Sequence, residues 1–91
     1  MYPMRKEEID CSDDLKFSVI KHLQGKLSKD YRDTNTMDGV RVNLDDGWVL
    51  IRASNTSPMI RITIEGNTER IVDELAAKFL KQTQDAIETL R

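Results

Sequence analysis

Apolar and polar residues alternate along two segments of this chain, and this period of two predicts β-strands that bury one face. The first segment, VRVNL, covers residues 40–44, and the second, IRITI, covers residues 60–64. Between them, residues 48–52 read WVLIR, an apolar run that we expect to be buried on both faces and therefore central in the sheet. The sequence Asp-Asp-Gly at residues 45–47 lies between the first segment and this apolar run. It predicts a hairpin turn in which Gly47 is available for a positive φ.

Apolar residues at helical spacing predict one helix before these strands and one after them. The first helix begins at residue 12 or 13, with Ser12 as its N-cap, and ends at about residue 24, where Gly25 provides a stop. The second covers about residues 68–90 and places its apolar side chains on one stripe.

The remaining segments are polar, and they complete the expected fold. Residues 1–11 are predicted to form an extended lead-in or an edge strand, and residues 28–38 a turn-rich connection with a short strand starting near Tyr31. Strands followed by a packing helix predict an α+β fold, with an antiparallel sheet of about four strands covered by helices on one face. A chain of 91 residues fits a single domain, residues 1–91, and it shows no internal repeat.

Charge and residue content argue against several classes of function. The net charge is −2, whereas a general nucleic-acid-binding protein usually carries a basic surplus. No apolar run approaches the ~18 residues of a membrane span. The single cysteine, Cys11, can form no internal disulfide, so we expect a cytoplasmic protein. Because His22 lacks an evident ligand partner and no nucleophile–base pair is apparent, we expect no metal site and no catalytic residue in this chain.

One heptapeptide, RASNTSP, has the side chains that recognise a phosphate dianion. The guanidinium of Arg52 can grip two phosphate oxygens, and Ser54 and Thr56 supply hydroxyl donors. Asn55 adds an amide and tolerates left-handed backbone geometry, so that successive N–H groups can form an anion nest. Pro58 ends the segment. A polar loop between two strands has the same composition for turn reasons alone, so the residues by themselves leave both interpretations open.

The heptapeptide resembles the phosphate-binding loop of the α-D-phosphohexomutases, which reads roughly R-x-S-[NG]-T-x-P between two strands of the last domain. The preceding segments DGVRV and GWVLI resemble the approach to that loop, and the final amphipathic helix also matches. The similarity covers about residues 38–90. It implies a C-terminal (fourth) domain whose fold is similar to that of the TATA-box-binding protein.

The resemblance also implies a function for the parent enzyme. Such an enzyme interconverts hexose 1- and 6-phosphates of mannose or glucose through a phosphoserine and a bisphosphorylated sugar, with magnesium bound by another domain. In this chain, Arg52, Ser54, Asn55 and Thr56 would hold the phosphate that is not transferred, and Arg61 is a possible auxiliary residue. The chain would correspond to about the last fifth of the enzyme, an excised domain that is inactive alone. Its partners would be a hexose phosphate and the other domains, with no nucleic acid and no membrane.

The subgroup and the functional class each have alternatives. Ala53 with Asn55 resembles the phosphomannomutase/phosphoglucomutase branch, whereas the phosphoglucosamine mutase branch more often has Pro and Gly at these positions. Ser57 departs from the Glu often found before the proline, so the C-terminal domain of a phosphoglucosamine mutase is one alternative. A free-standing protein-interaction or anion-binding module is the other.

Overall fold

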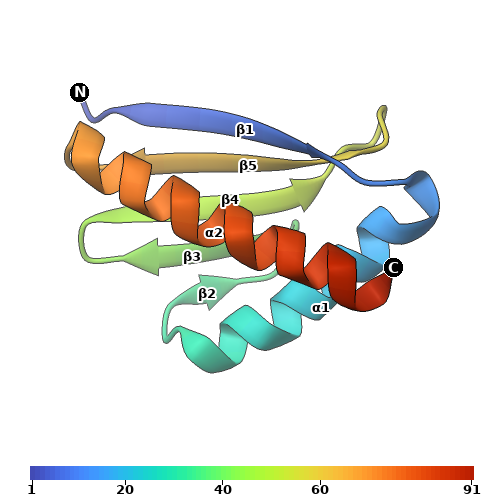
Figure 1. Ribbon diagram of the computed structural model, residues 1–91. Coiled ribbons are helices and arrows are strands. Elements are labelled where there is room, and N and C mark those ends of the chain that lie inside the picture. The colour runs from blue at the N-terminus through green and yellow to red at the C-terminus, as the bar shows by residue number, and fades with distance from the viewer.

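The computed structural model describes all 91 residues, which form one five-stranded antiparallel sheet and two helices. In sheet order the strands run β1-β5-β4-β3-β2 (Figure 1). The elements in chain order are β1 (Met4–Asp10), α1 (Asp13–Asp30), β2 (Thr34–Asn35), β3 (Val40–Leu44), β4 (Gly47–Ala53), β5 (Met59–Gly66) and α2 (Glu69–Leu90). The α+β class and the antiparallel sheet are confirmed, with five strands in place of about four.

Both helices pack on the same face of the sheet and enclose one core. In the register of β4 and β5, Ile51 lies opposite Ile62 and Val49 opposite Ile64, and all four side chains are fully buried. Phe79 is the largest fully buried side chain that α2 adds to this core. The helices contact each other as well as the strands, and Figure 1 shows α2 crossing the sheet. The buried residues of α1 are Lys16, Val19, Ile20, Leu23 and Leu27.

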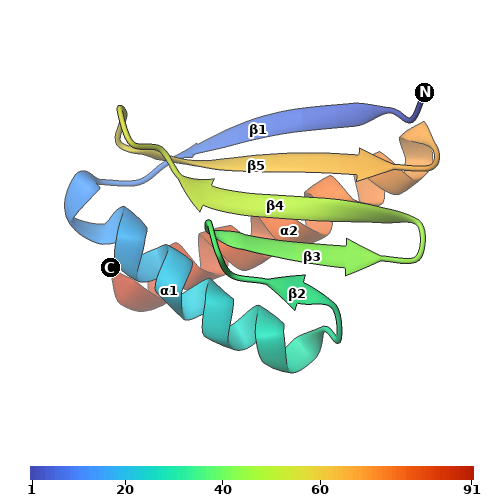
Figure 2. The same ribbon diagram turned by 180° about the vertical axis from the view of Figure 1, so that it is seen from behind.

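The opposite face of the sheet has no helix over it, and Figure 2 views the molecule from that side. Trp48 and Leu50 of β4 therefore remain half-exposed, although β4 is the third of the five strands. The expected central position of β4 is confirmed, but the expected burial on both faces is wrong. On the open face, neighbouring side chains shield the apolar residues of β4 only partly from solvent. One example is the guanidinium of Arg41, which stacks 4.2 Å from the centroid of the Trp48 ring.

The first helix does not stop at Gly25 but continues to Asp30. Leu27 explains this continuation, because it extends the apolar stripe by another turn and is fully buried. Burial of a leucine contributes about 1.5–3 kcal/mol, which exceeds the roughly 0.5–1 kcal/mol by which a helical glycine is disfavoured against alanine. The helix ends after Asp30, and its C-cap is Tyr31, whose N–H donates to the Leu27 carbonyl at 2.9 Å.

Two glycines lie where a side chain would not fit. Gly39, in the turn before β3, has the one positive φ in the chain, at 72°. Gly47 does not have the positive φ that its turn sequence predicted. A Cβ atom at Gly47 would lie 2.3 Å from the Glu65 carbonyl oxygen, so close approach to β5 is what requires glycine there.

The two helix starts differ in how they are capped. Thr68 precedes α2, and its hydroxyl accepts a hydrogen bond from the Ile71 N–H at 3.2 Å. Ser12 occupies the N-cap position of α1 as expected, but its side chain makes no capping hydrogen bond. Neither helix has the length and apolar character needed to cross a membrane.

Candidate functional site

The segment between β4 and β5 forms a tight loop whose backbone is held on several sides. The Ser54 N–H donates to the Met59 carbonyl at 3.0 Å, and the Met59 N–H donates to the Ser57 carbonyl at 2.8 Å. On the outside, the Cys11 N–H donates to the Pro58 carbonyl at 2.9 Å and ties the loop to the segment between β1 and α1. The loop therefore has a defined shape at one end of the sheet.

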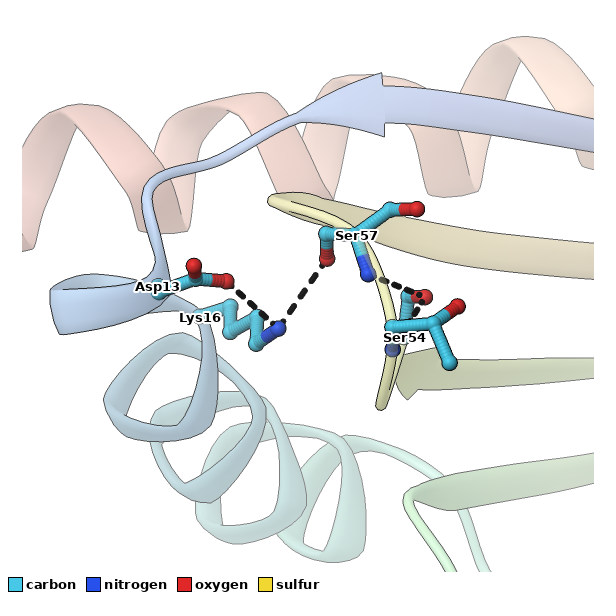
Figure 3. Close-up of polar contacts among 5 residues, drawn as sticks. Asp13, Lys16, Ser54 and Ser57 are labelled. Carbon is cyan, nitrogen blue, oxygen red and sulfur yellow. Dashed lines mark hydrogen bonds and ion pairs between the residues drawn. The ribbon is translucent and has the colours of Figure 1, made fainter.

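Ser54 organises the inside of this loop. The residue is only 4% exposed, and its Oγ accepts hydrogen bonds from the Thr56 N–H at 3.3 Å and the Ser57 N–H at 3.2 Å (Figure 3). These two N–H groups point at Ser54 and not into an open anion nest, which corrects the expectation from sequence. The Ser54 hydroxyl proton is left available to donate, because its oxygen is the acceptor in both contacts.

Asn55 and Thr56 form the exposed tip of the loop. No residue other than glycine has a positive φ, so Asn55 is not in the left-handed conformation that its sequence context allowed. The turn needs no left-handed residue because the Ser54 side chain satisfies the N–H groups two and three residues ahead. The side chains of Asn55 and Thr56 thus remain free to meet a ligand.

Two arginines stand beside the loop on the open face of the sheet. Arg52 of β4 and Arg61 of β5 are directly opposite each other in the strand register. Each has a carboxylate neighbour: Arg52 Nη1 lies 3.4 Å from Asp38 Oδ2, and Arg61 Nε lies 3.5 Å from Glu8 Oε2. Like charges directly opposite on neighbouring strands are unfavourable, so the two guanidinium groups depend on anionic neighbours, which Asp38 and Glu8 supply here.

The arginines and the loop line one hollow of about 200 Å³. No acidic residue lines it, although the whole chain carries more acidic than basic residues. The lining residues are Arg52, Ala53, Ser54, Asn55, Thr56 and Arg61. The structure therefore brings all the residues singled out in the sequence to one place, Arg61 among them.

Lys16 of α1 also contacts the loop, and the sequence interpretation missed it. Its Nζ donates to the Ser57 carbonyl at 3.0 Å and pairs with Asp13 Oδ1 at 2.7 Å (Figure 3). A signal was present in the sequence, because Lys16 shares the helical spacing of Val19, Leu23 and Leu27 and so falls on the buried stripe.

The buried position of the Cys11 thiol changes its acidity. Burial raises the pKa of the Cys11 thiol, and the positive charges of Arg91 and Lys16 offset this only in part. The thiol therefore stays protonated at neutral pH and has little nucleophilic character. No three His, Cys, Asp or Glu side chains converge in a way that could hold a metal ion.

Comparison with known proteins identifies the family of the chain. A sequence model of one family, described as "Phosphoglucomutase/phosphomannomutase, C-terminal domain", matches residues 9–82. The chain belongs to this family. The matched region contains the whole loop, both arginines of the hollow and Lys16.

Individual relatives of this phosphoglucomutase/phosphomannomutase C-terminal domain come from archaea. A "Probable phosphoglucosamine mutase" of Methanopyrus kandleri is 43% identical over 99% of the chain and 20% of the relative. The phosphoglucosamine mutase of Methanocaldococcus jannaschii is 36% identical over 98% of the chain and 20% of the relative. A phosphopentomutase of Thermococcus kodakarensis is 38% identical over 81% of the chain and 18% of the relative. The chain spans about a fifth of the length of these relatives.

A solved structure supports the fold of the domain. A phosphoglucomutase/phosphomannomutase family protein of Burkholderia thailandensis superposes with a TM-score of 0.74 at 23% identity, over 94% of the chain and 18% of the solved chain.

Proposed function

We propose that this domain binds the phosphate group of a sugar phosphate within a phosphohexomutase, and that other domains carry out the phosphoryl transfer. The observation that supports this is the hollow beside the β4–β5 loop, which two opposed arginines and three polar loop residues line without any carboxylate. A phosphate dianion requires such a set of fixed charges and donors.

Each residue of the hollow has a distinct part in the proposed binding. The guanidinium of Arg52 leaves Asp38 and forms paired hydrogen bonds to two phosphate oxygens, while Arg61 contributes charge from the neighbouring strand. The hydroxyl protons of Ser54 and Thr56 and the amide of Asn55 donate to the remaining oxygens. Bound in this way, the phosphate that is not being transferred fixes the orientation of the sugar and directs its other end to the reacting groups.

For the substrate, we propose a glucosamine phosphate first, because several archaeal relatives carry the name phosphoglucosamine mutase. Mannose or glucose phosphate is the second candidate, since Ala53 and Asn55 resemble the phosphomannomutase/phosphoglucomutase branch. Both candidates share the phosphate group, which is the part of the substrate that the hollow is proposed to bind.

The domain alone is proposed to bind its ligand without turning it over. The magnesium ion implied by the resemblance does not fit this chain, because no three potential metal ligands converge, and we assign it to another domain of the parent enzyme together with the phosphoserine. With a single phosphate held by one loop and no partner domain, the expected dissociation constant is about 1 mM.

The test is a titration of the ¹⁵N-labelled domain with inorganic phosphate and with glucosamine 6-phosphate. We expect saturable shifts of the amides of residues 52–57 and none with unphosphorylated glucosamine. Arg52→Gln should weaken binding by about tenfold or more, the scale of a lost hydrogen bond to a charged group. Arg70→Gln, at an exposed position at the start of α2, is the matched control and should bind as the wild type does. Equal binding by Arg52→Gln and the wild type would refute the proposal.

A further inference from the structure

Helix α1 contacts the candidate loop although it is distant from it in sequence, and we propose that it positions the loop for phosphate. Lys16 is the principal positioning residue, and Gln24, two turns further along the helix, is the second. This inference rests on the proposed function, because a positioned loop has a measurable consequence here only if the loop binds an anion.

Burial of Lys16 is the first argument. Lysine is rarely buried unless it is paired, yet Lys16 is only 4% exposed. An apolar residue of similar volume would fill the same space without the cost of removing an ammonium group from water. Asp13, the partner of Lys16, is 71% exposed at its side chain, so it gains little from the pair. The ammonium also lies 5.4 Å from the centroid of the Phe17 ring, but Phe17 is 58% exposed and the contact is weak. The hydrogen bond to the Ser57 carbonyl is therefore the contact that accounts for a lysine at this position.

The second argument is the chain of contacts from Lys16 to the hollow. The Ser57 carbonyl accepts hydrogen bonds from Lys16 Nζ and from the Met59 N–H, so its peptide group is held from two directions. The N–H of the same residue donates to Ser54 Oγ, which lines the hollow. Figure 3 shows this sequence of contacts from Asp13 through Lys16 and Ser57 to Ser54. Movement of Ser57 would therefore displace a phosphate donor.

Gln24 supports the other end of the loop, where Arg52 lies, through hydrogen bonds to the turn before β3. Its Nε2 donates to the Gly39 carbonyl at 2.8 Å and to the Thr36 carbonyl at 3.3 Å. Gly39 in turn packs against the backbone of β4: a Cβ atom there would lie 2.2 Å from the Ile51 carbonyl oxygen and 2.7 Å from the Cβ of Arg52. One rigid helix thus fixes the two ends of the phosphate site relative to each other.

The test measures phosphate affinity and stability separately in variants of α1. Lys16→Met keeps the apolar stem and removes the ammonium, and we expect it to bind inorganic phosphate about tenfold more weakly, with altered amide shifts at residues 54–57 in the free protein. Lys16→Arg, which keeps a donor and a charge, should restore part of the affinity. Lys26→Met removes the exposed pair with Asp30 on the same helix and should bind as the wild type does.

The outcomes separate this inference from the proposed function. A folded wild type that binds no phosphate refutes the proposed function itself. A wild type that binds, with a folded Lys16→Met of unchanged affinity, overturns the positioning role alone, even if that variant unfolds more easily. Should Lys16→Met fail to fold, Gln24→Met decides: a severalfold loss of affinity supports the inference, and wild-type affinity overturns it.

Discussion

Arg52 and Arg61 face each other across β4 and β5, and each is accompanied by a carboxylate that does not enter the hollow. Their side chains are 46% and 45% exposed, so solvent screens these ion pairs and they hold the arginines only weakly. Under the proposed function, a phosphate dianion can therefore replace Asp38 or Glu8 beside its arginine with little loss of free energy.

This arrangement gives a prediction for Asp38. The carboxylate competes with phosphate for the Arg52 guanidinium, so Asp38→Asn should bind phosphate about two- to threefold more tightly at low ionic strength, the modest scale of an exposed ion pair. The gain should shrink as salt is added, because screening weakens the pair that the variant lacks. Isothermal calorimetry at two salt concentrations measures both effects. Weaker binding by Asp38→Asn would mean that Asp38 holds Arg52 in its binding position.

For these residues, the sequence predicted which side chains lie together but not which hydrogen bonds each one makes. The types and spacing of Arg52, Ser54, Asn55 and Thr56 were sufficient to place them around one hollow. That Ser54 would be buried and accept two backbone hydrogen bonds depends on the path of the loop, which local composition does not determine. Lys16 was missed because its partner, the Ser57 carbonyl, is 41 residues away in the chain.

Among the elements, α1 differs most from its prediction, because it passes through Gly25 to Asp30. Gly25 is exposed, and a Cβ atom built there would meet nothing within 4 Å. The low helix propensity of glycine predicted that the helix would end there. Burial of Leu27 stabilises the helix beyond that point. Strand β5 was predicted more accurately, because a period of two with three isoleucines leaves no competing structure. The short strand expected to start near Tyr31 begins instead at Thr34.

The helical glycine provides a prediction at this scale. Gly25→Ala should raise the free energy of unfolding by about 0.5–1 kcal/mol, because alanine restricts the unfolded chain and adds no clash in the helix. Urea unfolding followed by circular dichroism measures the change. Phosphate affinity should stay at the wild-type value, since Gly25 is exposed and a Cβ atom there would contact no residue of the loop. Destabilisation by this substitution would contradict the observed extent of α1.

The whole molecule combines a covered sheet face that forms the core with an open face that carries the arginines. Seventeen buried apolar residues form one continuous core beneath the two helices, so the domain has a hydrophobic core of its own. The sequence predicted this layered architecture from periodicity. Neither periodicity nor composition could show that α1 would reach the loop, because that contact arises only when the sheet and both helices are assembled.

The most direct test of the account is a crystal structure of this domain soaked with glucosamine 6-phosphate. We predict a phosphate group in the hollow of the β4–β5 loop, with its oxygens about 2.7–2.9 Å from the Arg52 guanidinium nitrogens and with Asp38 released from that side chain. The hydroxyls of Ser54 and Thr56 should lie within hydrogen-bonding distance of the same group. A phosphate bound elsewhere, or an empty hollow with Arg52 still paired to Asp38 at saturating ligand, would contradict it.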